Sequence, residues 1–219
     1  MTRFSGACRA VQTLPALTLV ASPGTAAAQN VTLDFTGLSG ASVSPTYGTV
    51  PGLFDVAGRT VTSFGNASPA CGGGGGERLE SWPAYGGLIE IAYTCSNGTV
   101  GEFLFQPAAG YRVFLNSLQL ASLVSLRDYT VNVYDAAWTP LVAQTGTVDV
   151  VPLTITPNVS STTGLYLQWG TDWNVGIDNI SLTLQQIPAV MPEPGLVALP
   201  ATGLVAAASA ARRRRQRGG

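Results

Sequence analysis

The sequence predicts an all-β fold, a single antiparallel β-sandwich of about ten strands that occupies residues 29–190. Three observations predict it. Short apolar runs with an alternating pattern follow one another, almost no stretch has helical spacing, and twenty glycines fall within residues 29–190, where they favour turns and bulges. No linker-like stretch separates two groups of strands, so we expect one domain.

The candidate strands are the apolar runs that lie between turn residues. Residues 129–134 show the pattern most clearly, as in a strand buried on one face only. One face carries Tyr129, Val131 and Val133, and the other carries Thr130, Asn132 and Tyr134. Residues 135–140 then combine Asp, Thr and Pro, which predicts a hairpin turn. In chain order, the predicted strands are 31–35, 60–64, 88–94, 100–105, 112–121, 129–134, 141–145, 153–155, 165–169 and 177–184.

Composition and charge exclude several kinds of site. The 219 residues contain no histidine, which excludes Ser-His and Cys-His nucleophile pairs and histidine metal ligands. Residues 29–190 carry four arginines against eleven acidic residues, whereas both ends of the chain are basic. An acidic domain with scattered arginines cannot neutralise a phosphate backbone, so we expect no nucleic-acid partner.

Residues 1–28 form a candidate secretory signal peptide. Arg3 and Arg9 lie at its start, an apolar stretch follows at 11–21, and three alanines come at 26–28, where the small residues Ala26 and Ala28 suit signal peptidase. We expect cleavage before Gln29. The alternative is a packed N-terminal helix.

Residues 191–219 have the features of a second targeting segment. An uncharged stretch, 195–211, is about 26 Å long as a helix, which is marginal for crossing a bilayer. It is followed by a cluster of basic residues that should stay on the cytoplasmic side, which places the preceding domain outside. The basic cluster consists of Arg212, Arg213, Arg214 and Arg215, with Arg217 close behind.

The order of Pro192, Glu193 and Pro194, a short apolar helix and an arginine cluster resembles the PEP-CTERM sorting signal of exopolysaccharide-producing Gram-negative bacteria. The resemblance covers residues 191–217 only. It implies that exosortase, an integral-membrane cysteine protease, cuts near this triplet while the helix holds the protein in the inner membrane, and passes the protein to the cell surface or extracellular matrix. An ordinary single-pass anchor would not require the triplet, and a GPI signal would not end in arginines.

Cys71 and Cys95 are the two cysteines that remain after the signal peptide is removed. Outside the cytoplasm they could form one disulfide, which would close a loop of about 25 residues and stabilise the fold by roughly 3 kcal/mol. The alternatives are two free thiols or a pair of metal ligands, and a metal site would need further ligands.

The last predicted strand carries the motif Gly-Ile-Asp-Asn-Ile at 176–180, which resembles the last strand of many PEP-CTERM proteins and of jelly-roll sandwiches of the galactose-binding or carbohydrate-binding type. The resemblance implies that this strand pairs with the opening strand around Asp34. In carbohydrate-binding relatives a structural Ca²⁺ lies beside the paired terminal strands, which implies Asp34, Asp178 and Asn179 as candidate ligands. The alternative is that Asp178 and Asn179 bond to neighbouring backbone.

A sugar-binding surface combines an aromatic platform with amide or carboxylate side chains, because sugars present apolar C–H faces ringed by hydroxyls. Residues of these types fall in predicted loops and are our candidates for such a surface. The alternative is that the aromatic rings pack over the ends of the sandwich, and we expect Trp169, on a strand, to lie in the core. The candidates are Trp82, Tyr85, Trp138, Asp172 and Trp173.

Enzymatic activity is not expected. A glycosidase needs two carboxylates about 5 to 9.5 Å apart, and nothing marks two of Glu77, Glu80, Glu90 and Glu102 as partners, so we expect them to be solvated surface acids. We therefore predict a non-catalytic exported protein of the cell surface or exopolysaccharide matrix, with polysaccharide as a candidate partner. A structural or adhesive module and a glycoside-cleaving enzyme are the alternatives.

Overall fold

The computed structural model describes residues 27–71 and 77–188. Most of the predicted signal peptide, the glycine run 72–76 and the whole predicted sorting segment 191–219 lie outside the described residues. Within the two described ranges, no helix is long and apolar enough to cross a membrane. The transmembrane helix expected at 195–211 therefore stays a prediction.

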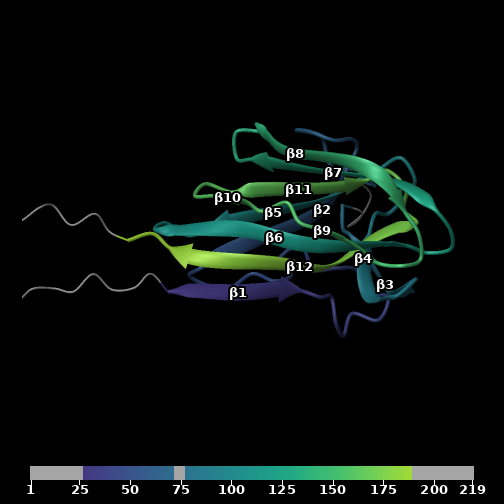
Figure 1. The fold of residues 1–219 in the computed structure, drawn as a ribbon, viewed down its shortest axis with the longest axis horizontal. Coiled ribbons are helices and arrows are strands. Elements are labelled where there is room, and N and C mark those ends of the chain that lie inside the picture. Colours follow the sequence, from purple (N-terminus) through teal and green to yellow (C-terminus); the bar gives the residue numbers. More distant parts are fainter. Residues whose placement is uncertain (1–26, 72–76, 189–219) are drawn as a thin grey trace, which may run out of the picture.

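The described residues form two antiparallel sheets that pack face to face (Figure 1). The seven-stranded sheet has the order β10-β6-β12-β4-β3, with β1 also on β12 and β9 on β6. The five-stranded sheet has the order β2-β5-β11-β7-β8. The strands are β1 (Ala28–Leu33), β2 (Phe54–Val61), β3 (Glu80–Tyr85), β4 (Leu88–Tyr93), β5 (Val100–Pro107), β6 (Tyr111–Ser122), β7 (Arg127–Asp135), β8 (Pro140–Val148), β9 (Leu153–Ile155), β10 (Val159–Ser161), β11 (Leu165–Gly170) and β12 (Val175–Gln186).

The strand order is that of a jelly roll. From β4 onward the chain passes back and forth between the sheets, so that β4, β12, β6 and β10 are neighbours in one sheet and β5, β11, β7 and β8 in the other. The predicted fold class, an all-β jelly-roll-like sandwich, is confirmed.

Nine of the ten predicted strands coincide closely with observed ones, and the differences have local causes. The strand predicted at 60–64 is observed as β2, earlier in the chain, because Gly58 interrupts the apolar pattern at a core position. A Cβ there would lie 2.7 Å from the ring of Phe103, so only glycine fits. Two observed strands were not predicted: β10, which has only three residues, and β3, which contains Pro83, a residue that an edge strand tolerates.

The pairing of the first and last strands is confirmed. β1 runs antiparallel to β12 from Ala28, opposite Gln185, to Leu33, opposite Ile180. The backbone N–H of Gln186 donates to the carbonyl of Ala27 at 3.2 Å, so both ends of the described domain lie side by side (Figure 1).

Aromatic rings fill the core between the sheets. Trp169 is fully buried, as expected, and stacks on Phe103 with ring centroids 5.5 Å apart. Gly101 makes room for this indole, because a Cβ at that position would lie 2.3 Å from it. Large substitutions at residue 101 would therefore displace the central ring of the core.

The predicted disulfide between Cys71 and Cys95 is confirmed, with Cα atoms 6.5 Å apart. The bond excludes the two alternatives, free thiols and a pair of metal ligands. It joins the segment that follows β2 to the loop between β4 and β5.

Candidate functional site

The five candidate sugar-binding residues do not form one surface. Trp138 lies in the turn between β7 and β8, and Asp172 and Trp173 lie in the loop between β11 and β12. Trp82 and Tyr85, which were expected in loops, belong to β3 instead. Trp82 is 48% exposed and available to a ligand.

Tyr85 is a correction to the predicted set, because its side chain is only 1% exposed and cannot stack on a sugar. Its hydroxyl donates to the carbonyl of Trp173 at 2.8 Å, and its ring stacks on Tyr93. Burial raises the pKa of the Tyr85 hydroxyl, which stays neutral. Tyr85 thus fixes the loop that carries Trp173, whose exposed ring packs against Tyr93.

Trp138 belongs to a cluster of three half-buried aromatic rings on the outer face of the five-stranded sheet. Its indole stacks on Tyr166 of β11, with centroids 4.0 Å apart and planes at 20°. Tyr134 of β7, the register partner of Tyr166, packs against the same indole at 5.5 Å. These three residues are called the sheet-face platform below.

The turn holds Trp138 in a conformation that glycine would adopt more easily, with φ at 63°. The carboxylate of Asp135 accepts hydrogen bonds from the backbone N–H groups of Ala137, at 2.8 Å, and Thr139, at 2.9 Å. The N–H of Trp138 itself donates to the carbonyl of Asp135. A tryptophan kept in a strained conformation by several hydrogen bonds has a fixed position, and such strain is concentrated at binding sites.

Polar groups lie next to the platform. The side-chain amide of Asn132 donates to the hydroxyl of Tyr134 at 3.1 Å, which leaves that hydroxyl free to donate. Asn132 and Tyr134 share the outer face of β7, because the residues between and beside them point into the core. The alternation at 129–134 predicted that Asn132 and Tyr134 share one face of the strand. Nothing in the sequence predicted that Tyr166 would stack on Trp138.

A loop covers the same face beside the platform. Gln168 of β11 exchanges two hydrogen bonds of 2.8 Å with the backbone N–H and carbonyl of Gly65, and it is fully buried. The segment that contains Gly65, residues 62–68, is closed by a hydrogen bond from Thr62 to Ser68 and is called the covering loop.

Glu102 supports this loop and is not the surface acid that we expected. It is 1% exposed, and its carboxylate accepts hydrogen bonds from Arg59 at 2.7 Å and from Gln168 at 2.6 Å. A buried carboxylate requires such partners. Alternation along each strand could not predict this ion pair. Arg59 and Glu102 lie on strands far apart in the chain, and only the register between β2 and β5 places them opposite each other.

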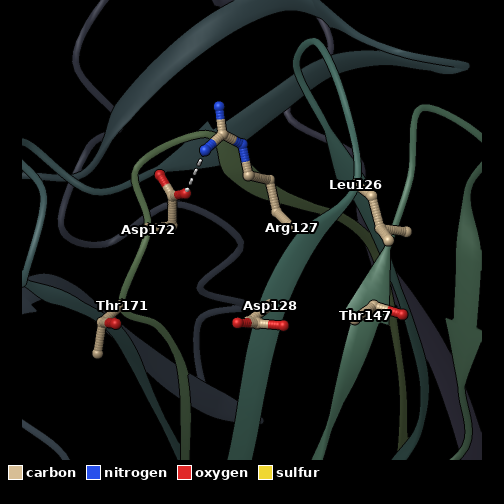
Figure 2. Close-up of a pocket in the computed structure, with 6 residues that line it drawn as sticks. All are labelled: Leu126, Arg127, Asp128, Thr147, Thr171 and Asp172. Carbon is tan, nitrogen blue, oxygen red and sulfur yellow. Dashed lines mark ion pairs between the residues drawn. The ribbon is translucent and has the colours of Figure 1, made fainter.

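A polar pocket of about 350 Å³ lies at the other end of β7 from the platform (Figure 2). Arg127 and Asp172 lie next to each other in its lining, with Nη1 and Oδ2 3.6 Å apart. Asp172 is held in place because its Oδ1 accepts hydrogen bonds from the backbone N–H and the amide of Asn174. The lining residues, called the end pocket below, are Leu126, Arg127, Asp128, Thr147, Thr171 and Asp172.

The three candidate calcium ligands, Asp34, Asp178 and Asn179, line one cavity of about 470 Å³. Asp178 is 3% exposed, and its Oδ1 accepts a hydrogen bond from the backbone N–H of Asn179 at 2.7 Å, as the alternative interpretation expected. Among residues 27–71 and 77–188, no group of three or more cysteine, aspartate or glutamate side chains is placed to hold a metal ion. The calcium site therefore stays a prediction.

Burial raises the pKa of Asp178 to about 7, opposed by its hydrogen bond from Asn179 and reinforced by the charges of Asp34 and Glu90. Glu90 also accepts hydrogen bonds from the N–H of Gly37 and from the hydroxyl of Ser39, which connects β4 to the segment after β1. These carboxylates therefore hold loops together.

Comparisons with protein-family models and with curated proteins gave no match. Solved structures that match include "CBM4 structure and function", at 11% identity and a TM-score of 0.26, covering 68% of this chain and 76% of that one. "Structure of Arabinose-Bound MgGH51 a-L-Arabinofuranosidase Crystal Type 1" matches at 14% identity and a TM-score of 0.30, and the match covers 74% of this chain and 31% of that one. "Structure of TmCBM61 in complex with beta-1,4-galactotriose at 1.4 A resolution" matches at 13% identity and a TM-score of 0.25, and the match covers 70% of this chain and 98% of that one. The fold assignment rests on the strand order of the chain itself.

Proposed function

We propose that this chain is an exported, non-catalytic protein of the cell surface or exopolysaccharide matrix that binds polysaccharide on the sheet-face platform. The observation that carries the binding proposal is the stack of Trp138 on Tyr166, held by the Asp135 turn on an outer face. A fixed aromatic ring offers a sugar a flat apolar contact without loss of side-chain entropy. The neighbouring Tyr134 hydroxyl and Asn132 amide supply the polar contacts.

The non-catalytic part of the proposal is supported by the contacts of the glutamates. Glu102 is locked between Arg59 and Gln168, and Glu80 and Glu90 accept hydrogen bonds from serines of the segment between β1 and β2. These contacts engage the carboxylates with groups of the protein, whereas a general acid or base must reach the proton of a ligand.

The export part rests on the two terminal segments and on the disulfide, a bond typical of proteins in oxidising compartments outside the cytoplasm. We expect mass spectrometry of the native secreted protein to find a chain that begins at Gln29 and lacks the residues after Pro194. A chain that keeps its arginine tail in the matrix, or that is found only in the cytosol, would contradict this part.

Replacing Trp138 with alanine should weaken retention on neutral polysaccharides in affinity gels by about 30-fold, the loss typical of a central aromatic contact. Trp138→Gly should have the same effect on binding while changing stability by less than about 1 kcal/mol, because glycine relieves the strain at φ 63° as the stacking is lost.

The matched control is Trp82→Ala, which removes an equally large exposed ring from β3 and should leave retention unchanged. If Trp82→Ala or Trp173→Ala weakens retention and Trp138→Ala does not, the binding surface lies elsewhere. If no neutral polysaccharide retards the native protein, the aromatic cluster is structural and the chain is a structural or adhesive module.

A further inference from the structure

The outer face of β7 connects the sheet-face platform to the end pocket. Every second residue of the strand faces outward, in the order Asp128, Thr130, Asn132 and Tyr134. Their register partners on β8 are exposed small or polar residues, with Thr147 opposite Asp128, Thr145 opposite Thr130 and Ala143 opposite Asn132. The two strands therefore present a shelf of hydroxyl, amide and carboxylate groups, about 20 Å long between Asp128 and Tyr134 at 3.3 Å per residue.

The covering loop bounds this shelf on one side. Gln168, which the loop covers through Gly65, is the register partner of Asn132 on the neighbouring strand β11. The opposite side is the exposed strand β8, the last strand of the sheet. The covering loop occupies the face above Gln168, the next outward-facing residue of β11 after Tyr166, so the open path from the platform toward the other end of the sheet runs along β7 and β8.

The end pocket offers unsatisfied hydrogen-bonding groups at the far end of the shelf. The distance of 3.6 Å between Nη1 of Arg127 and Oδ2 of Asp172 is too long for a hydrogen bond, so both partly exposed groups keep hydrogen-bonding capacity for a ligand. The carboxylate of Asp172 is held in position by Asn174. A sugar hydroxyl donates and accepts at the same time, so it can bridge such a guanidinium and carboxylate.

The charges favour an uncharged ligand. The end pocket contains Arg127 against Asp128 and Asp172, and the whole of residues 29–190 has eleven acidic residues against four arginines. An anionic glycan would be repelled by this field, whereas a neutral glycan would not.

We propose that an extended, uncharged glycan chain of several sugar units lies along the outer face of β7, with one end stacked on the sheet-face platform and the other hydrogen-bonded in the end pocket. The inference rests on the proposed polysaccharide binding and adds the direction of the chain, its charge and a second group of contacts. The site is longer than the platform alone, so its affinity depends on the length of the glycan.

The test is calorimetric titration with neutral oligosaccharides, from disaccharide to hexasaccharide, prepared from the polysaccharide that retards the native protein. The affinity should rise with length and then level off once the shelf is filled. Asp172→Asn should weaken hexasaccharide binding about tenfold, the loss expected for a hydrogen bond to a charged group, and should leave disaccharide binding unchanged. Trp138→Ala should weaken binding at every length.

A pair of matched variants tests the direction in which the glycan lies on the sheet. Thr145→Arg places a long side chain on the shelf, and Ala57→Arg places the same side chain on the exposed outer face of β2, two strands from Tyr166 and away from the shelf. Only Thr145→Arg should weaken hexasaccharide binding. If only Ala57→Arg does so, the glycan crosses the sheet and the inference is overturned.

The remaining outcomes separate the two proposals. If Asp172→Asn and Thr145→Arg leave hexasaccharide binding unchanged while Trp138→Ala weakens it, the platform binds alone and the extended site is rejected. If Trp138→Ala has no effect at any length, or nothing binds, the proposed function fails together with the inference. If an acidic oligosaccharide binds more tightly than a neutral one of equal length, the inference that the ligand is an uncharged glycan is rejected.

Discussion

Replacing Cys71 and Cys95 together with serine should lower the free energy of unfolding by about 3 kcal/mol, which corresponds to a fall in melting temperature of roughly 6 to 12 °C. The bridge spans 24 positions of the sequence, a segment that includes the β3–β4 hairpin. Without it, the unfolded chain gains the conformational freedom of this loop. Thermal denaturation of the native and double-serine proteins measures the difference.

Reductant provides the control for the disulfide prediction. It should lower the melting temperature of the native protein toward that of the double variant, and it should not affect the double variant. The same treatment should weaken binding of long oligosaccharides, because the bridge anchors Cys71, three residues after the covering loop, to the loop between β4 and β5. A double variant that melts at the native temperature would show that the bridge contributes nothing to stability.

The melting temperature should fall as the pH rises from about 5 to about 8, because burial raises the pKa of Asp178 to about 7 in the folded protein. The unfolded chain releases this proton near pH 4, whereas the folded chain keeps it until about pH 7. The stabilisation is therefore fully present below about pH 4 and is lost as the pH rises through the folded pKa. A fall of at least about 3 °C is expected, equivalent to roughly 1 kcal/mol.

Asp178→Asn should remove this slope, because a neutral amide replaces the carboxyl that must ionise. Asp55→Asn, at an exposed position of β2, should retain it. A melting temperature that rises toward pH 8 would contradict the assignment. If calcium raises the melting temperature near pH 8 and a chelator reverses the effect, Asp34 and Asp178 hold a cation there after all.

Alternation along single strands allowed much of the fold to be predicted. The pattern at 129–134 placed Thr130, Asn132 and Tyr134 on one face of β7, and the turn at 135–140 was recognised from its Asp and Pro. The prediction failed where a strand lacked that pattern, as in β2, where glycine occupies a core position, and in β3, which contains proline.

The candidate site was predicted less completely, because its residues are brought together by register between strands. Trp138 was recognised as a turn aromatic, but Tyr166 lies 28 positions later and reaches it only because β11 and β7 are neighbours. The same holds for Arg59 and Glu102, and for Tyr85, whose burial depends on the loop that carries Trp173.

The amino-acid sequence by itself determined the class of fold, because alternation shows the side on which each side chain points, and it left only one possible pair of cysteines for a disulfide. The pairing of the terminal strands was expected from a resemblance, and the structure established both that pairing and the disulfide. Tertiary structure alone decided which aromatic rings stack, which acids are buried and where a ligand could lie, since alternation with a period of two specifies a face of a strand but not the neighbouring strand.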